Sequence, residues 1–152
     1  MFPASIIDLV KNRLGDRFDD YLIPPPVFVN MQGEFVEFDL DSDTLITRFP
    51  VLDMYLNPYG YMQGGMVAAA VDNTLGPLSM VVAPPNVTRR LEMKYSRPVT
   101  PDLEYITVKG KLLERKGRWL RFSAEVRDQE GLLLARARAV HWIIDDPGEI
   151  DD

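Results

Sequence analysis

The feature that most constrains the fold of this chain is an apolar segment at residues 65–80 that contains a single charged side chain. Three consecutive alanines at residues 68–70 favour a helix, and apolar residues would lie on almost every side of it. A helix without a polar face is expected to be buried. The sequence therefore predicts one long central helix around which the rest of the chain is wrapped.

The charged residue in this helix is Asp72, and no other Asp, Glu, Lys, Arg or His occurs between Met54 and Thr88. A carboxylate in apolar surroundings is destabilising unless its environment compensates for the lost hydration. Two interpretations remain open. Asp72 is either a buried residue that is hydrogen-bonded to nearby backbone or to a hydroxyl, or a general base in an apolar pocket.

The start of the helix favours the second interpretation. Gly64 and Gly65 follow a turn-forming loop at residues 57–60. The first turn of a helix presents unpaired N–H groups and a positive dipole end, and glycines let a ligand approach that backbone closely. Such a place suits an oxyanion or a polarised carbonyl. The alternative is a Gly-Gly turn that only leads into the helix.

The run NPYGYMQGG at residues 57–65, with Asp72 after it, resembles the signature of the hotdog-fold acyl-CoA thioesterases of the phenylacetate-degradation (PaaI-like) group. These belong to the 4-hydroxybenzoyl-CoA thioesterase superfamily. The family signature is N-x-x-G-x-x-H-G-G, with an Asp nine residues after the His, and here Asp72 lies nine residues after Gln63. Thr88, Tyr95 and Pro98 resemble the family's hydroxyl-bearing residue and Y-x-x-P strand. The resemblance covers roughly residues 27–144, and its departure is Gln63 in place of the His.

The resemblance implies a role for each of five residues. Asp72 would act as general base or nucleophile at the thioester carbonyl, and the backbone N–H of Gly64 would polarise that carbonyl. Asn57 would help to hold the thioester, and Thr88 would help to place the attacking water. Gln63 can donate and accept hydrogen bonds but does not titrate, so it would orient the acyl carbonyl without any dependence of activity on a His pKa.

Two of these assignments have alternatives within the sequence. Asn57 also reads as a turn residue before Pro58, and Thr88 as an ordinary strand residue. Strict alternation puts Thr88 on the same face as Arg90, so Thr88 reaches the pocket only through a bulge or a strand end. The same alternation puts His141 on the inner face of the last strand, where we interpret it as a packed histidine outside the site.

Basic residues suggest where the phosphates of coenzyme A would bind. Arg89, Arg90 and Lys94 form one cluster after the helix, and residues 115–118 form another at a turn. Either cluster can hold phosphates or can be a solvated strand end. We assign Arg89, Arg90, Lys94 and the Gly65 backbone to substrate binding.

Composition excludes several classes of protein. The 152 residues suit a single domain, and a net charge of −6 argues against nucleic acid as the partner. The chain has no cysteine and one histidine, so neither a disulfide framework nor a Cys or His metal site is expected. The acidic turn at residues 39–43 lacks the EF-hand pattern. Without a signal peptide or a membrane span in the sequence, we expect a cytoplasmic protein with no metal and no redox cofactor.

The remaining segments predict one helix and six strands. Residues 5–14 read as a short amphipathic helix that Ser5 caps and Gly15 stops, followed by a proline-rich linker that ends at residue 26. Alternation indicates strands at residues 27–39, 44–49, 87–99, 103–114, 118–127 and 132–144. Alanines at every second position of the last strand would let a helix lie close to it. Residues 145–152 form an acidic tail that we expect to be disordered.

These elements predict an α+β hotdog fold, in which an antiparallel sheet of about six strands wraps around one long central helix. A sheet with a single helix leaves a face and two edges uncovered, so we expect a homodimer, and beyond it a dimer of dimers. We predict hydrolysis of an acyl-CoA to the free acid and CoA. Two rivals stay open: a non-catalytic acyl-CoA binding protein, with Gln63 marking lost catalysis, and a hotdog hydratase or dehydratase.

Overall fold

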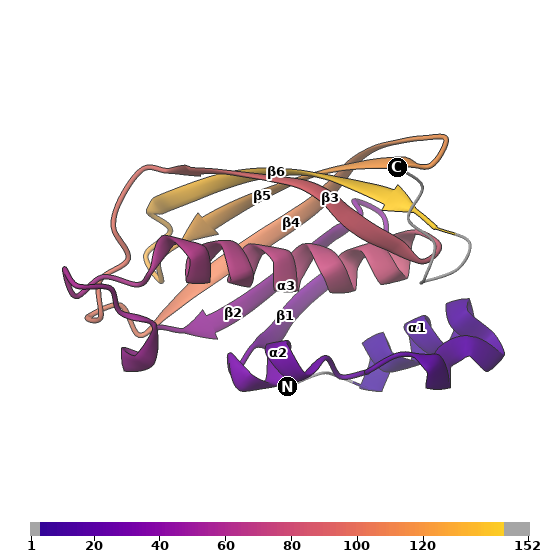
Figure 1. Cartoon of the computed structure of the whole chain (residues 1–152), viewed down its shortest axis with the longest axis horizontal. Helices are drawn as coiled ribbons and strands as arrows, with labels where there is room; N and C mark the ends of the chain where they lie inside the picture. Colours follow the sequence, from indigo (N-terminus) through magenta and orange to yellow (C-terminus); the bar gives the residue numbers. More distant parts are fainter. Residues whose placement is uncertain (1–3, 145–152) are drawn as a thin grey trace.

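The computed structural model describes residues 4–144 and contains a six-stranded antiparallel sheet with one long helix lying across one face (Figure 1). The strands lie in the order β1-β2-β4-β5-β6-β3. Their bounds are β1 (Glu34–Asp39), β2 (Thr44–Pro50), β3 (Asn86–Tyr95), β4 (Tyr105–Lys116), β5 (Trp119–Arg127) and β6 (Leu133–Ile143). The helices are α1 (Ala4–Leu14), α2 (Pro26–Asn30) and α3 (Gly64–Val82), with 3-10 turns at Gly15–Asp20 and Asp53–Tyr55. The predicted hotdog fold is confirmed, and the acidic tail lies outside the described residues.

The central helix α3 packs directly over Gly110 of β4. A Cβ atom on Gly110 would lie 2.8 Å from Leu75 Cδ2 and 3.3 Å from Thr74 Cγ2, so this approach requires a glycine. Next to it, the hydroxyls of Thr47 and Thr74 are 2.6 Å apart, and Thr74 also donates to the carbonyl of Ala70 at 2.8 Å. Both threonines are buried, so their hydroxyls fix the rotation of α3 on the sheet.

The alanine row of β6 is buried on the inner side of the sheet, as expected, but it does not mark the closest approach of the helix. Ala135, Ala137 and Ala139 are each almost inaccessible. The strands that α3 mainly contacts are β4, β2, β3 and β5. Gly110, rather than the alanine row, therefore lets the helix lie close to the sheet. A strand position with no side chain admits a helix more closely than one with a methyl group.

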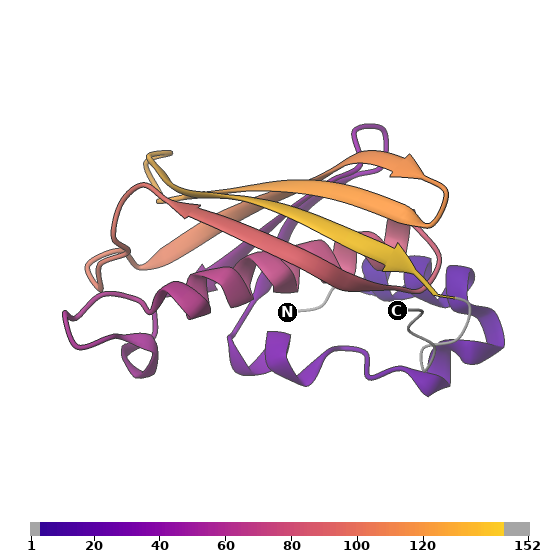
Figure 2. The same ribbon diagram turned by 45° about the horizontal axis from the view of Figure 1, so that its top comes forward.

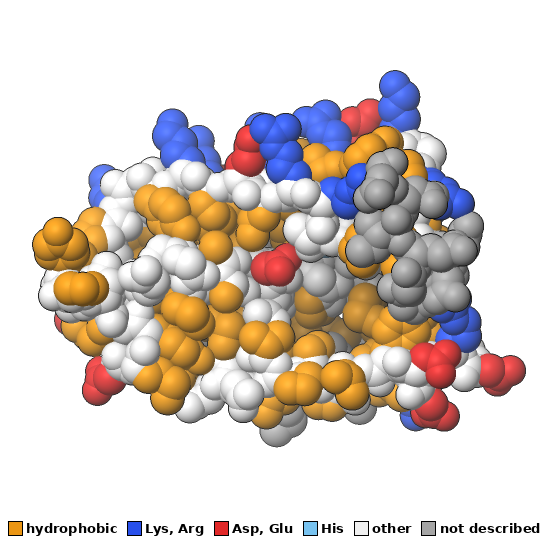
Figure 3. All heavy atoms as spheres, viewed as in Figure 1, with side chains coloured by type: hydrophobic (Ala, Val, Ile, Leu, Met, Phe, Trp, Pro, Cys, Tyr) orange, Lys and Arg blue, Asp and Glu red, His pale blue; other side chains and the backbone are white. Residues whose placement is uncertain are grey.

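One face of α3 is not covered by this chain, so the prediction that the helix is buried on all sides is wrong. Asp72 and Gly65 are exposed, and Ala69, Gly76 and Met80 are half-buried. These five residues recur every three or four positions and form one stripe, which we call the α3 stripe. Figure 3 shows hydrophobic side chains gathered over this face, with an acidic group in its middle.

Helix α3 begins one residue before and ends two residues after the predicted segment at residues 65–80. Pro77 lies inside the helix without ending it. A proline removes one backbone hydrogen bond from a helix, and here its ring is buried in the core. Among residues 4–144, α3 is the one helix long and apolar enough to cross a membrane. Buried core helices meet the same criteria, and half of its most apolar window is buried inside the structure.

The N-terminal segment lies along one side of the molecule, below α3 (Figure 2). Ile6 and Val10 of α1 are buried next to α3, which agrees with the predicted packing on the outside of the main body. Gly15 ends α1 with a φ of +57°, as predicted, and the chain continues as a 3-10 turn. Ser5 is not the cap, because the helix already includes Ala4.

The first predicted strand is wrong in its first half. Residues 26–30 form α2 instead, and β1 begins only at Glu34. Pro26 occupies the first turn of α2, where the missing N–H needs no partner. Phe28 then packs into the core, stacked on Phe35 with ring centroids 4.8 Å apart and edge-on to Phe49 at 5.5 Å. The apolar residues that resembled strand alternation thus belong to a single helical turn.

Replacement of Gly110 tests the helix–sheet contact. Gly110→Ala should lower the free energy of unfolding by about 1–3 kcal/mol, because the new methyl group meets the fully buried Leu75 side chain at a distance that requires a shift. Chemical denaturation measures the change. Lys109→Ala, an exposed change in the same strand, is the control and should stay within about 0.5 kcal/mol of wild type. Equal stability of both variants would contradict the close approach.

Candidate active site

Asp72 lies in the middle of α3 and is hydrogen-bonded to a residue of β3. The hydroxyl of Thr88 donates to Asp72 Oδ1 at 3.1 Å. Thr88 can reach the helix because the register of β3 against β6 shifts between Thr88 and Arg90, as happens at a β-bulge. This shift puts Thr88 on the same face as Leu91. The bulge that Thr88 was predicted to need in order to reach the pocket is therefore present. Both Asp72 and Thr88 are exposed on the face of the α3 stripe.

Two further side chains continue this contact, and sequence reasoning missed their part in it. Thr88 Oγ1 lies 3.3 Å from His141 Nε2, and His141 Nδ1 lies 2.8 Å from Asn86 Oδ1. His141 is a packed residue, as predicted, with 1% of its surface exposed and its ring 4.7 Å from that of Phe122. His141 was predicted to lie outside the site, and the structure places it in contact with Thr88, which it opposes in the β3–β6 pairing.

Burial determines the charge of His141. Loss of hydration lowers the pKa of the imidazole from 6.5 to about 4, and the negative charge of Asp72 opposes this shift. As the pH falls, His141 therefore takes up a proton at a higher pH in the unfolded chain than in the folded chain. His141 is therefore neutral at neutral pH, with one ring nitrogen protonated and the other free to accept a hydrogen bond.

The start of α3, eight residues before Asp72, forms a second polar site. Asn57 and Gly64 line one cavity of about 290 Å³, together with Tyr95 and Arg97. Asn57 Oδ1 accepts hydrogen bonds from the N–H groups of residues 59 and 61, at 3.0 and 3.1 Å. Asn57 therefore stabilises the turn, as one of its two interpretations predicted. Its amide NH₂ group can still donate a hydrogen bond to a ligand in the cavity.

Gly64 is the first residue of α3, so its N–H has no partner within the helix. Its carbonyl accepts a hydrogen bond of 2.5 Å from the Tyr95 hydroxyl, and a Cβ on Gly64 would lie 3.3 Å from the Tyr95 ring. A Cβ on Gly65 would meet nothing within 4 Å, so the backbone there is open to a ligand. Gln63 precedes the helix with its side chain exposed, and it does not line the cavity.

The predicted basic residues lie on the outer face of the sheet, away from α3. Leu91 and Met93 pack on the core, so Arg90 and Lys94 point the other way. Arg90 forms an ion pair with Glu92. Within one chain the structure therefore does not bring this basic cluster together with Asp72, because the sheet separates them.

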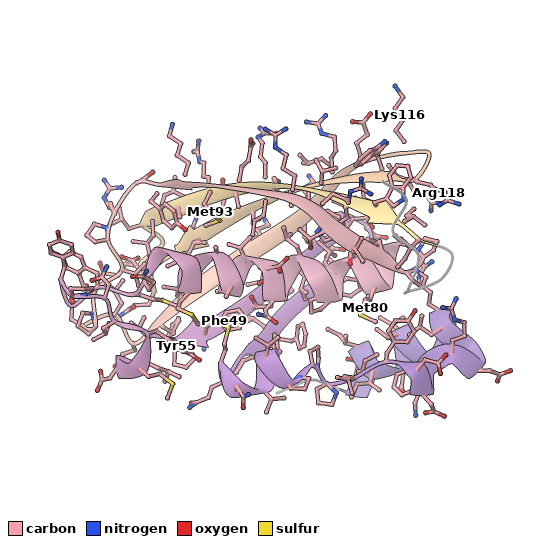
Figure 4. All side chains as sticks on the ribbon, in the orientation of Figure 1. Phe49, Tyr55, Met80, Met93, Lys116 and Arg118 are labelled. Carbon is pink, nitrogen blue, oxygen red and sulfur yellow. The ribbon has the colours of Figure 1, made fainter. Side chains whose placement is uncertain are left out.

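The two predicted basic clusters meet at a pair of tryptophans. Trp119 and Trp142 pack edge to face with ring centroids 4.5 Å apart. The guanidinium of Arg89 lies 5.6 Å from the Trp142 ring, and that of Arg118 lies 5.8 Å from it. Figure 4 shows Arg118 and Lys116 together at the β4–β5 turn, projecting away from α3.

Within the described chain, then, the site consists of two separate halves on one rigid helix. Gly64 and Asp72 are eight residues apart in α3, which is about 12 Å at the helical rise of 1.5 Å per residue. A carboxylate beside a hydroxyl can accept a proton from water, and a helix N-terminus beside an amide can polarise a carbonyl. Residues 4–144 bring together no group of three or more His, Asp or Glu side chains that could hold a metal ion.

Comparisons with known proteins identify the family. The sequence model of the thioesterase superfamily matches residues 59–135, just over half of the chain. A search among curated proteins found no match.

Solved structures share the fold at low identity. A putative thioesterase related to phenylacetic acid degradation, from Ralstonia eutropha JMP134, is 23% identical with a TM-score of 0.75, over 89% of this chain and 98% of that one. The PaaI protein of E. coli is 11% identical with a TM-score of 0.74, over 91% and 96%. A Streptococcus mutans protein bound to acetyl CoA is 20% identical with a TM-score of 0.68, over 74% and 88%. This chain therefore belongs to the thioesterase superfamily, with a PaaI-like hotdog fold and the family's activity on thioesters.

Proposed function

We propose that this chain is an acyl-CoA thioesterase that releases a free acid and CoA. The observation that carries the proposal is the hydrogen bond from Thr88 of β3 to Asp72 of α3, the helix whose first turn, with Asn57, lines a cavity. Two structures of the same fold contain the expected ligand: the S. mutans protein holds acetyl CoA, and a Streptococcus pneumoniae hypothetical thioesterase holds coenzyme A. These ligands support a CoA thioester as the substrate.

In the proposed reaction, the oxygen of a water molecule attacks the thioester carbonyl carbon while Asp72 accepts one of its protons. The N–H of Gly64 and the amide of Asn57 donate to the carbonyl oxygen as negative charge develops on it. The carbon–sulfur bond then breaks, and the thiolate of CoA takes up the proton. Thr88 holds the water beside Asp72, and the open backbone of Gly65 lies along the substrate.

The distance along α3 requires a partner chain for this chemistry. A reacting carbon must lie within hydrogen-bond reach of both halves, or one bridging water away, and a helix cannot bend to close about 12 Å. Two antiparallel α3 helices across a two-fold axis would bring the start of one beside the middle of the other. We therefore infer two composite sites per homodimer, each with Gly64 of one subunit and Asp72 of the other.

Two surfaces of the chain support such a dimer. The α3 stripe is an apolar surface of small residues, and a second stripe laid against it would bury Asp72 in the surroundings that suit a general base. Strand β3 is at one edge of the sheet, with its outer backbone groups available for pairing with another strand. A second copy would cover both surfaces at once, and dimers of this kind could assemble further into a dimer of dimers.

For the phosphates of CoA we propose Arg89 and Arg118, the members of the two basic clusters that meet on Trp142. Guanidinium groups bind phosphate with paired hydrogen bonds, and the tryptophan pair offers aromatic surface to an adenine ring. Arg90 and Lys94, on the outer face of the same strand, would add positive charge nearby.

A non-catalytic acyl-CoA binding protein is the second candidate, because Gln63 stands where the family has a His. Within one chain the Gln63 side chain is exposed and does not line the cavity. A panel of aromatic, medium-chain and long-chain acyl-CoAs, scored for thiol release, separates the two functions. Tight binding across the panel without thiol release would favour the binding protein.

Substitution of Asp72 tests the general base. Asp72→Asn keeps the side-chain volume but cannot accept the proton, so kcat should fall by about 10² or more while the protein stays folded. Thiol release measures the activity and circular dichroism the fold. Asp53→Asn removes the same charge from an exposed 3-10 turn and should retain wild-type kcat. Near wild-type thiol release by folded Asp72→Asn would remove Asp72 from the mechanism.

Subunit complementation tests the composite site. Chains carrying Asp72→Asn are mixed with chains carrying Asn57→Ala and Gly64→Ala, each inactive alone, and the subunits are allowed to exchange. A heterodimer then contains one doubly damaged site and one intact site, so thiol release should return toward half of wild type per heterodimer. If native mass spectrometry verifies exchange and no activity returns, the two halves do not act across a subunit interface.

A further inference from the structure

Four polar side chains form one continuous chain of contacts that starts at Asp72 and runs into the core. Asp72 on α3 contacts Thr88 on β3, Thr88 contacts His141 on β6, and His141 contacts Asn86 at the start of β3. The proposed mechanism uses only the first two of these residues. The pair of the buried His141 and the half-buried Asn86 therefore needs a role of its own.

The orientation of Asn86 is set by its backbone neighbours. Its Nδ2 group donates to the carbonyl of Pro84 at 2.9 Å and lies 3.4 Å from the carbonyl of Ser79. A carbonyl can only accept, so the NH₂ end of the amide must face these two groups. The oxygen of Asn86 consequently faces His141 Nδ1, and an acceptor at 2.8 Å requires a proton on that nitrogen.

This contact determines which tautomer His141 adopts. The ring is neutral because it is buried, and a neutral imidazole carries one proton. With that proton on Nδ1, Nε2 carries a lone pair directed at Thr88 Oγ1. Asp72 is the charged group that faces the ring, from α3, while the neighbours from β3 and β5 are the uncharged Asn86, Thr88 and Phe122.

Thr88 then has one hydroxyl proton and two acceptors for it, Asp72 Oδ1 at 3.1 Å and His141 Nε2 at 3.3 Å. The two acceptors cannot both receive it. We propose that His141, oriented by Asn86, is a positioning residue that lets the Thr88 hydroxyl turn away from Asp72 when the attacking water binds. The proposal rests on the thioesterase mechanism above.

Rotation of the Thr88 hydroxyl changes the hydrogen bonds that the attacking water can form. While Thr88 donates to Asp72, it occupies the carboxylate that should act as base. Once Thr88 donates to His141 Nε2, its oxygen accepts one hydrogen of the water and Asp72 accepts the other, so the water oxygen directs a lone pair at the thioester carbon. The proton lost from water ends on Asp72, and His141 gains none at any step.

The single histidine of the chain makes the tautomer directly measurable. Nitrogen-15 NMR of uniformly labelled protein, expressed without a histidine tag, should show one imidazole with a protonated Nδ1 and an unprotonated Nε2, neutral at pH 7 and titrating near pH 4. In Asn86→Ala this preference for Nδ1–H should be lost. A wild-type ring protonated at Nε2, or charged at pH 7, would overturn the proposal whether or not the protein hydrolyses any thioester.

A double-mutant cycle then tests whether His141 acts through Thr88. His141→Phe removes the acceptor and keeps a ring in place, and it should lower kcat about five- to tenfold with little change in KM. In a Thr88→Val background the same change should have almost no effect on kcat. Phe122→Leu, which loosens the packing of the His141 ring without touching a hydrogen bond, is the control and should have equal effects in both backgrounds.

The outcomes separate this proposal from the one on which it rests. Wild-type thiol release with equal effects of His141→Phe in both backgrounds leaves the thioesterase in place and overturns the positioning role. An absence of thiol release by wild type across the acyl-CoA panel overturns the thioesterase, and with it the positioning role. Loss of the His141→Phe effect in the Thr88→Val background, with the Nδ1–H tautomer seen by NMR, supports both.

Discussion

The packing of one rigid helix against one glycine in the sheet is the constraint on which the rest of the structure depends. Gly110 lets α3 lie close to β4, and the buried hydroxyl pair of Thr47 and Thr74 fixes its rotation. That rotation turns Asp72 toward the uncovered face and keeps the apolar side of the helix in the core. The rigidity of α3 also holds Gly64 about 12 Å from Asp72, so the two halves of the site have a fixed separation.

A local irregularity in β3 completes the Asp72 half of the candidate site. Without the bulge between Thr88 and Arg90, Thr88 would lie on the outer face, on the far side of the sheet from Asp72. With it, Thr88 lies between a carboxylate that is open to solvent and a histidine that is buried. The Thr88 hydroxyl thus lies between a solvent-exposed carboxylate and a buried imidazole, and this arrangement suits the proposed role of orienting one water molecule.

The two uncovered surfaces of the chain, the α3 stripe and the edge of β3, would both suit the same partner. The α3 stripe exposes small apolar residues around Asp72, and β3 offers an unpaired edge beside it. A buried carboxylate of the kind expected from sequence is therefore not a property of this single chain. It would arise only when a second helix covers the stripe, and the same contact would join the Gly64 half of one subunit to the Asp72 half of the other.

The sequence by itself determined the order of the six strands around the central helix, the position of Asp72 within that helix and the glycines at its start, because helix and strand periodicity and the placement of a lone charge are local properties. It did not distinguish α2 from a strand, since a five-residue apolar run satisfies both patterns. Only the tertiary structure decided that His141 and Asn86 continue the contact between Asp72 and Thr88, and that the Arg90 and Lys94 side chains do not lie beside Asp72 within one chain. Those relations depend on which strands pair and on a one-residue shift in their register, and residues 86 and 141 come together only when β3 closes against β6.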